Sequence, residues 1–136
     1  MKKTDISALT LRLSLALGFL SAVASRLGYW GQQSSGWVHF LSYTGQVNSF
    51  LPKAFIPVIA TASTAVETCL GLSLLIGFKT NITAFCAAIL TLIFAAAMTY
   101  SFGIKEPLDY SVFAFSAGAF QLATIHRHRW SMDQLL

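Results

Sequence analysis

The chain has 136 residues, of which 55% are hydrophobic and only 10% charged, and its formal net charge is +4. Soluble domains carry about 25% charged residues, so this composition excludes an ordinary soluble enzyme and indicates a membrane protein. The basic residues stand singly or in pairs at the ends of apolar segments, which excludes the clustered basic face of a nucleic-acid-binding protein. The length allows a single domain, residues 1–136.

Residues 6–24 form the first predicted membrane span. At 1.5 Å per residue they extend roughly 28 Å, close to the thickness of about 30 Å of a bilayer's hydrocarbon core. Lys2 and Lys3, with the triplet Ala22-Val23-Ala24, resemble a secretory signal and its cleavage site. Because Arg12 interrupts the apolar run, we expect the segment to be retained as a helix.

The loop that follows, residues 27–53, is rich in glycine and polar residues. Within it, residues recur at helical spacing and are mostly apolar: Trp37, Phe40, Leu41, Thr44 and Val47. This pattern predicts a short amphipathic helix lying at the membrane interface. A second interpretation stays open, in which the aromatic side chains of the loop cover a pocket from the outer side.

Two further spans, residues 55–77 and 82–100, are joined by a very short turn and should therefore be antiparallel neighbours. A fourth span is predicted over residues 110–125, with Asp109 placed to cap its helix. The expected fold is an all-α integral membrane four-helix bundle of up-down-up-down topology, with a short interfacial helix in the first loop.

The basic residues outside these spans also predict an orientation. Five of them fall on one side of the membrane, namely Lys2, Lys3, Lys79, Arg127 and Arg129. Three fall on the other side: Arg26, Lys53 and Lys105. The positive-inside rule then places both termini in the cytoplasm.

Glu67 lies near the middle of the second span, where an ionisable residue costs roughly 2.5–3.5 kcal/mol on insertion scales. If the helix ends are level, Glu67, Arg12 and Gln121 share the cytoplasmic half of the bilayer, and Thr64 lies on the same face as Glu67. The sharper hypothesis is that Glu67, Arg12, Thr64 and Gln121 line a polar pocket that binds a small ligand or relays a proton. In the alternative, Arg12 snorkels to the headgroups, Glu67 bonds to threonines and Gln121 joins two helices.

No cofactor or metal is predicted. The three histidines lie in the first loop and in the C-terminal tail, so no pair faces across the bundle to hold haem, and the Glu-x-x-His pattern of di-iron bundles is missing. No catalytic motif is found either. Cys69 and Cys86 are interpreted as packing thiols, since free cysteine behaves as a small hydrophobe.

Two runs of sequence resemble a known family. Glu67-Thr68-Cys69-Leu70-Gly71-Leu72, followed by Leu75-Ile76-Gly77-Phe78-Lys79-Thr80, is similar to the central signature of the DoxX family of small bacterial membrane proteins, and the first span is similar to that family's opening helix. The resemblance implies a four-helix bundle in the bacterial inner membrane, linked to a thiosulfate:quinone oxidoreductase or to thiol redox partners. The absence of a cysteine pair on one face argues against a direct thiol oxidoreductase.

The predicted function is a non-catalytic subunit or partner-binding component of a respiratory or redox membrane system. Its partners would be the lipid bilayer together with another membrane or redox protein, or further copies of itself, and no nucleic acid. The alternative is a protein that binds quinone or lipid at a polar site around Glu67 and Arg12. A proton-coupled transporter is less well supported, because one buried acid and four helices leave little material for alternating access.

Overall fold

The computed structural model describes residues 2–136, and these residues form helices and connecting loops without any strand. The α-helices are α1 (Lys3–Arg26), α2 (Trp37–Val47), α3 (Ile56–Ile76), α4 (Thr80–Phe102), α5 (Lys105–Asp109) and α6 (Val112–Ala123). The short 3-10 helices are η1 (Gly31–Gln33), η2 (Lys53–Phe55) and η3 (Met132–Gln134). The all-α prediction is confirmed.

Within residues 2–136, three helices are long and apolar enough to cross a membrane: α1, the continuous segment Lys53–Ile76 that contains α3, and α4. They cover the first three predicted spans. α6 is equally apolar, but its 12 residues extend only about 18 Å.

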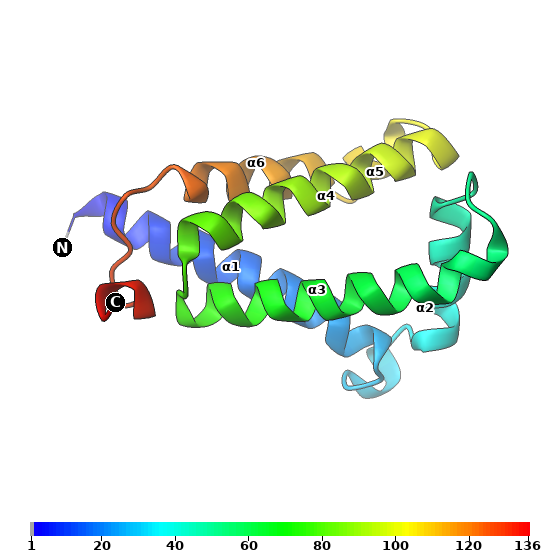
Figure 1. Cartoon of the computed structure of the whole chain (residues 1–136), viewed down its shortest axis with the longest axis horizontal. Helices are drawn as coiled ribbons and strands as arrows, with labels where there is room; N and C mark the ends of the chain where they lie inside the picture. Colours follow the sequence, from blue (N-terminus) through cyan, green and yellow to red (C-terminus); the bar gives the residue numbers. More distant parts are fainter. Residues whose placement is uncertain (1) are drawn as a thin grey trace.

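The helices pack in two pairs. α1 packs most extensively against α3, and α4 against α6, while fewer contacts join the pairs (Figure 1). Alanines of α4 and α6 permit close approach, and Ala84, Ala87, Ala88 and Ala119 have no exposed surface. Leu15, Phe19, Leu74 and Leu122 complete a core at the meeting of all four helices.

Gly71 of α3 and Gly77, the residue just after it, set the register of this helix against α1. A Cβ atom on Gly71 would lie 2.9 Å from the Leu20 side chain, and one on Gly77 would lie 2.7 Å from Nη1 of Arg12. Arg12 is therefore level with the last turn of α3. Aligned helix ends would instead have placed Ile6 there, so α1 is shifted by six residues, or about 9 Å.

The fourth predicted span is interrupted at its start. Asp109 is the last residue of α5, and its carboxylate forms an ion pair with Lys105 at 2.5 Å. Ser111, just before α6, has a left-handed backbone (φ 56°). The prediction that Asp109 caps this helix is wrong. The left-handed residue breaks the helical path, so α6 begins two residues later than expected.

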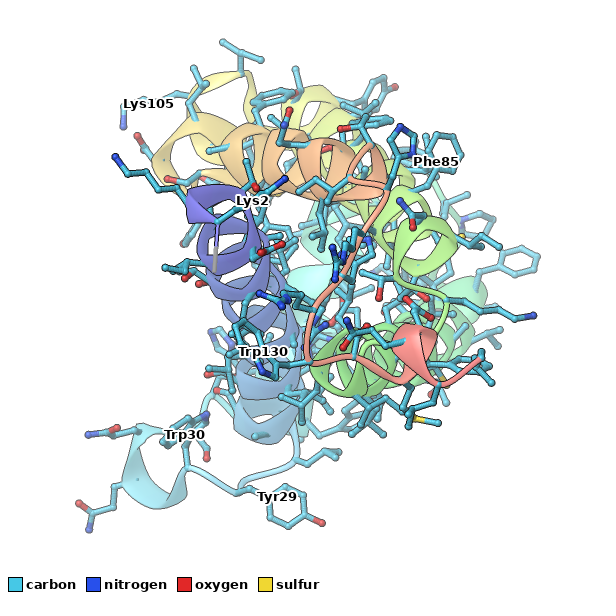
Figure 2. The ribbon with its side chains drawn as sticks, turned by 90° about the vertical axis from the view of Figure 1, so that its left-hand side faces the viewer. Lys2, Tyr29, Trp30, Phe85, Lys105 and Trp130 are labelled. Carbon is cyan, nitrogen blue, oxygen red and sulfur yellow. The ribbon has the colours of Figure 1, made fainter. Side chains whose placement is uncertain are left out.

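The C-terminal tail, residues 124–136, folds over one end of the bundle, where both termini lie (Figure 1). Arg12 donates a hydrogen bond to the carbonyl of Trp130 at 2.7 Å, and Arg129 lies 3.5 Å from Asp5. Figure 2 looks at this end and shows Trp130 on the tail beside α1.

Asp133 joins the tail to the start of α4. Its carboxylate accepts hydrogen bonds from the backbone N–H groups of Lys79 at 2.6 Å and Thr80 at 2.8 Å, and its own N–H donates to the carbonyl of Gly77. Burial by itself raises the pKa of Asp133, but the hydrogen bonds at Thr80 and Lys79 and the charge of His128 outweigh it, so this pKa lies below its ordinary value. The tail thus supplies the N-terminal cap that α4 lacks in its own sequence.

Candidate functional site: a buried Arg26–Glu67 pair between two cavities

Glu67 forms a buried ion pair with Arg26. Nη1 of Arg26 lies 2.6 Å from Oε2 of Glu67, and the two side chains are 13% and 3% exposed. At this distance the two groups form a close charge pair. The same nitrogen donates a hydrogen bond to Oγ1 of Thr64 at 3.2 Å. An unpaired charge inside a protein is strongly destabilising. The contact between these opposite charges offsets that cost, so both side chains stay buried.

Glu67 is held inside the bundle by its neighbours on α3. Gly71, one turn later, packs against Phe19 and Leu20 of α1 and turns this face of α3 inward. Thr64, one turn earlier, donates its hydroxyl hydrogen to the carbonyl of Ala60 at 2.8 Å, which leaves its oxygen facing Arg26 as an acceptor. The face of α3 that carries Glu67 and Thr64 is therefore the face that meets α1.

Arg26 connects three helices. It is the last residue of α1, it contacts Glu67 and Thr64 of α3, and its Cζ lies 3.8 Å from the centre of the Phe40 ring on α2. A guanidinium over an aromatic face at this distance is attracted by the ring's negative quadrupole. Arg26 thereby fixes α2 against the ion pair.

A cavity of about 110 Å³ lies on the α2 side of the ion pair; we call it the α2-side cavity. Its wall includes Phe40, Tyr43, Thr44, Val47, Asn48, Ile59, Ser63, Phe94 and Met98. The hydroxyls of Thr44 and Ser63 and the amide of Asn48 donate to backbone carbonyls. Burial, with the nearby Glu106 and Tyr110, raises the pKa of Tyr43 to about 12, so its phenol stays neutral.

A second cavity of about 220 Å³, the α6-side cavity, lies on the other side of the pair. Besides Arg26 and Glu67 it is lined by Gly18, Phe19, Ala22, Thr91, Phe94, Met98, Tyr110, Val112 and Phe115. The ion pair, Phe94 and Met98 line both cavities. The charged groups therefore stand between two largely apolar spaces at the loosely packed junction of the helix pairs.

Two of the four predicted site residues come together and two do not. Glu67 and Thr64 share the site through Arg26. Arg12 instead lies under the C-terminal tail, where it donates a hydrogen bond to the carbonyl of Trp130. Gln121 has an exposed side chain and lines neither cavity.

Arg26 is the site residue that the sequence analysis missed. The positive-inside count treats it as an external basic residue, because aligned helix ends put it beyond the membrane. The register set by Gly71 and Gly77 brings the end of α1 level with Thr64, and the long arginine side chain then reaches Glu67. The available signal was the pair of α3 glycines, which mark where a neighbouring helix approaches closely.

The aromatic residues of the first loop divide between the two interpretations. Phe40 and Tyr43 line the α2-side cavity, as a pocket cover requires. Tyr29 and Trp30 are exposed on the loop that follows α1, and neither lines this cavity (Figure 2). The aromatic residues that cover the α2-side cavity are therefore those of α2.

Comparison with protein families identifies the chain. A family model described as methylamine utilisation protein MauE matches residues 4–109. The chain belongs to the MauE family. The match takes in both residues of the ion pair and every helix from α1 to α5 apart from the first residue of α1. No curated protein and no solved structure matches the chain.

Membership of the MauE family overturns the resemblance to the DoxX family. The residues that carried that resemblance serve helix packing and a turn: Gly71 admits α1, and Gly77 ends α3 with a left-handed backbone (φ 73°). Any small bundle with a tight α3–α4 connection needs such residues, so they did not distinguish the two families. This MauE-family chain is a membrane protein.

The cysteines of this MauE-family protein are both free and both exposed on the outer surface of the helices, Cys69 on α3 and Cys86 on α4. Neither lines a cavity beside the ion pair. Residues 2–136 contain no cluster of three or more His, Cys, Asp and Glu side chains that could hold a metal ion. The polar chemistry at the bundle centre therefore rests on Arg26, Glu67 and Thr64.

Proposed function

We propose that this protein is a non-catalytic component of a methylamine utilisation system in the bacterial inner membrane. Family membership supports the link to methylamine utilisation. The single observation that carries the non-catalytic role is that the charged groups of the site are occupied with each other: Arg26 binds Glu67, Thr64 and the Phe40 ring. Such an arrangement holds helices together and leaves no free base or nucleophile at the centre.

We further propose an up-down-up-down bundle of four helices with both termini in the cytoplasm and α2 at the outer interface. The common location of the termini supports an even number of crossings (Figure 1). The predicted cytoplasmic residues Lys2, Lys79 and Arg129 belong to the end where the tail folds over the bundle. α6, preceded by α5, serves as the shorter fourth crossing, and residues 1–136 form one domain.

A non-catalytic component would act through partner proteins, so the test combines genetic complementation with purification of the protein and its partners. In a bacterium that carries this gene and grows on methylamine, deletion should abolish that growth and the wild-type gene should restore it. Arg26→Met should fail to complement, whereas Lys53→Met, which removes an exposed charge outside the site, should complement fully. Purification in a gentle detergent should recover another membrane or redox protein. Growth of the deletion strain, or retained activity of Arg26→Met, would contradict the proposal.

The site is poorly suited to carrying methylamine itself. A primary amine is protonated at neutral pH, as lysine is, and needs an anion or an aromatic face as its seat. Both are already taken by the guanidinium of Arg26. An incoming ammonium ion would have to displace a tethered cation, which argues against a methylammonium transporter and for an uncharged ligand.

A second candidate function, binding of a quinone or lipid headgroup, is supported by the two cavities that flank the pair. Their walls are mainly apolar and aromatic, with few polar groups, as in typical small-molecule sites. Ser63→Leu should fill the α2-side cavity and weaken binding of decylubiquinone, while Thr61→Leu, on the exposed surface of the same helix, should leave it unchanged. Equal binding by both variants would reject this site.

A further inference from the structure

A groove of about 510 Å³ opens at the end of the molecule where the tail meets the turn between α3 and α4. The turn contributes Lys79, and the tail contributes His126, Arg127 and the buried His128. It lies at the opposite end of the bundle from α2, so it is separate from the Arg26–Glu67 site (Figure 1). The groove brings the cationic side chains of Lys79 and Arg127 together in one concave region.

The groove carries a net positive charge, because it has two cationic side chains, Lys79 and Arg127, and a single carboxylate. Its one acidic residue, Asp133, directs both carboxylate oxygens to the backbone N–H groups of Lys79 and Thr80. Among residues 2–136, neither Lys79 nor Arg127 belongs to an ion pair. Two other arginines at this end, by contrast, are engaged, Arg12 by Trp130 and Arg129 by Asp5. Lys79 and Arg127 are therefore free to bind an anion.

The groove is continuous with the apolar outer surface of the bundle. Ile82 lines it and is 63% exposed, and Phe85, one turn further along α4, points outward (Figure 2). Phe85 also packs edge-to-face against Phe120 of α6, with ring centres 5.7 Å apart. Apolar side chains thus begin where the cationic groove ends. This order, cations first and then exposed aliphatic and aromatic groups, matches the order of a phospholipid from phosphate to acyl chain.

From this juxtaposition we propose that the groove binds the headgroup of an anionic phospholipid, with Lys79 and Arg127 on the phosphate and the acyl chains along Ile82 and Phe85. The low-charge, apolar surface beside the groove favours a lipid over a free phosphate ion, which has nothing to place there. A lipid bound here also contacts both the tail and the α3–α4 turn, so it stabilises their junction.

The test uses the full chain in detergent and measures binding of palmitoyl-oleoyl phosphatidylglycerol by native mass spectrometry. The double variant Lys79→Gln/Arg127→Gln should bind it about 25-fold more weakly, at about fivefold for each cation near a membrane surface. The control Lys2→Gln/Lys3→Gln removes the same charge from the same end but outside the groove, and should lose less than about threefold. Equal losses in the two double variants would overturn the proposal in favour of diffuse surface charge.

A second comparison tests the acyl-chain part of the proposal. Ile82→Ser should weaken binding of the phosphatidylglycerol, whereas Ile93→Ser, an exposed position on the same helix away from the groove, should not. Inorganic phosphate and palmitoyl-oleoyl phosphatidylcholine should bind far more weakly than the anionic lipid. Phosphate binding as tight as the lipid would identify a free-anion site, and equal binding of phosphatidylcholine would remove the role of charge, so either result rejects the proposal.

Discussion

Replacing Arg26 with methionine should destabilise the protein by about 3–5 kcal/mol, the usual cost of removing one partner of a buried ion pair. In this variant Glu67, 3% exposed, must either keep an unpaired charge or take up a proton. Protonating a carboxyl of ordinary pKa, about 4.3, at pH 7 costs roughly 3.7 kcal/mol at 1.36 kcal/mol per pH unit. This cost of proton uptake is the upper limit on the stability lost through the unpaired charge. The lost contact with Phe40 adds about 0.5–2 kcal/mol.

The partner variant should be milder. Glu67→Gln retains an acceptor oxygen, and Arg26 keeps its contacts with Thr64 and Phe40 at the end of α1. We expect a loss of about 1–2 kcal/mol. The double variant Arg26→Met/Glu67→Gln should be no less stable than Arg26→Met alone, because no buried charge is left without a partner. The coupling energy between the two sites should therefore exceed about 1 kcal/mol.

The measurement is reversible unfolding in mixed micelles with increasing SDS, followed by tryptophan fluorescence at pH 7 and pH 5. The deficit of Arg26→Met relative to wild type should shrink by about 2.7 kcal/mol at pH 5, since proton uptake then costs only about 1 kcal/mol. The double variant should show no such recovery. Lys53→Met is the control for loss of an exposed charge and should change stability by less than about 0.5 kcal/mol. Additive single effects, or a pH-independent deficit, would refute an ion pair that stabilises the fold.

Three further predictions concern the tail and the cysteines. Gly77→Ala should cost about 1–3 kcal/mol more than Gly103→Ala in the same unfolding assay. Both glycines have positive φ, but only at Gly77 would a Cβ atom meet the tail, 2.3 Å from Cβ of Ser131. Equal losses would mean that backbone strain is the whole cause. Burial lowers the pKa of His128, with a smaller contribution from Arg12 and against the opposing charge of Asp133. The stability that the neutral His128 contributes is therefore present above pH about 6.5 and is lost as the pH falls toward the lower pKa of the folded state. His128→Gln should reduce the difference in stability between pH 7.5 and 5.5, and an unchanged difference would count against this assignment. Cys69→Ala and Cys86→Ala should each change stability by less than about 0.5 kcal/mol and still support growth on methylamine, whereas loss of growth would reveal a thiol function.

The helices were largely predictable because their signals are local. The apolar runs of α1, α3 and α4 and the helical spacing in α2 follow directly from residue order. The start of α6 was not predictable in the same way. Its helix is broken by Ser111 in a left-handed conformation, which serine adopts only when the surrounding structure requires it.

The site was half predictable for a different reason. Glu67 could be identified from its cost within an apolar run, and Thr64 from its place on the same helix face. Its partner depended on how far one helix is shifted along another, and a six-residue shift replaces Arg12 by Arg26. That shift is determined by contacts at Gly71 and Gly77 between residues far apart in sequence, which a helix-by-helix alignment of membrane depths cannot supply.

The position of Asp133 has a consequence for biosynthesis. The carboxylate that closes the first turn of α4 lies 53 residues after Thr80. At translation rates of about 5–20 residues per second, the ribosome needs roughly 3–11 s to add it. During that interval the hairpin of α3 and α4 exists with open amide groups at its connection, available to water, to lipid phosphate or to an insertion factor. Completion of this membrane hairpin is therefore a late event, separated in time from its synthesis.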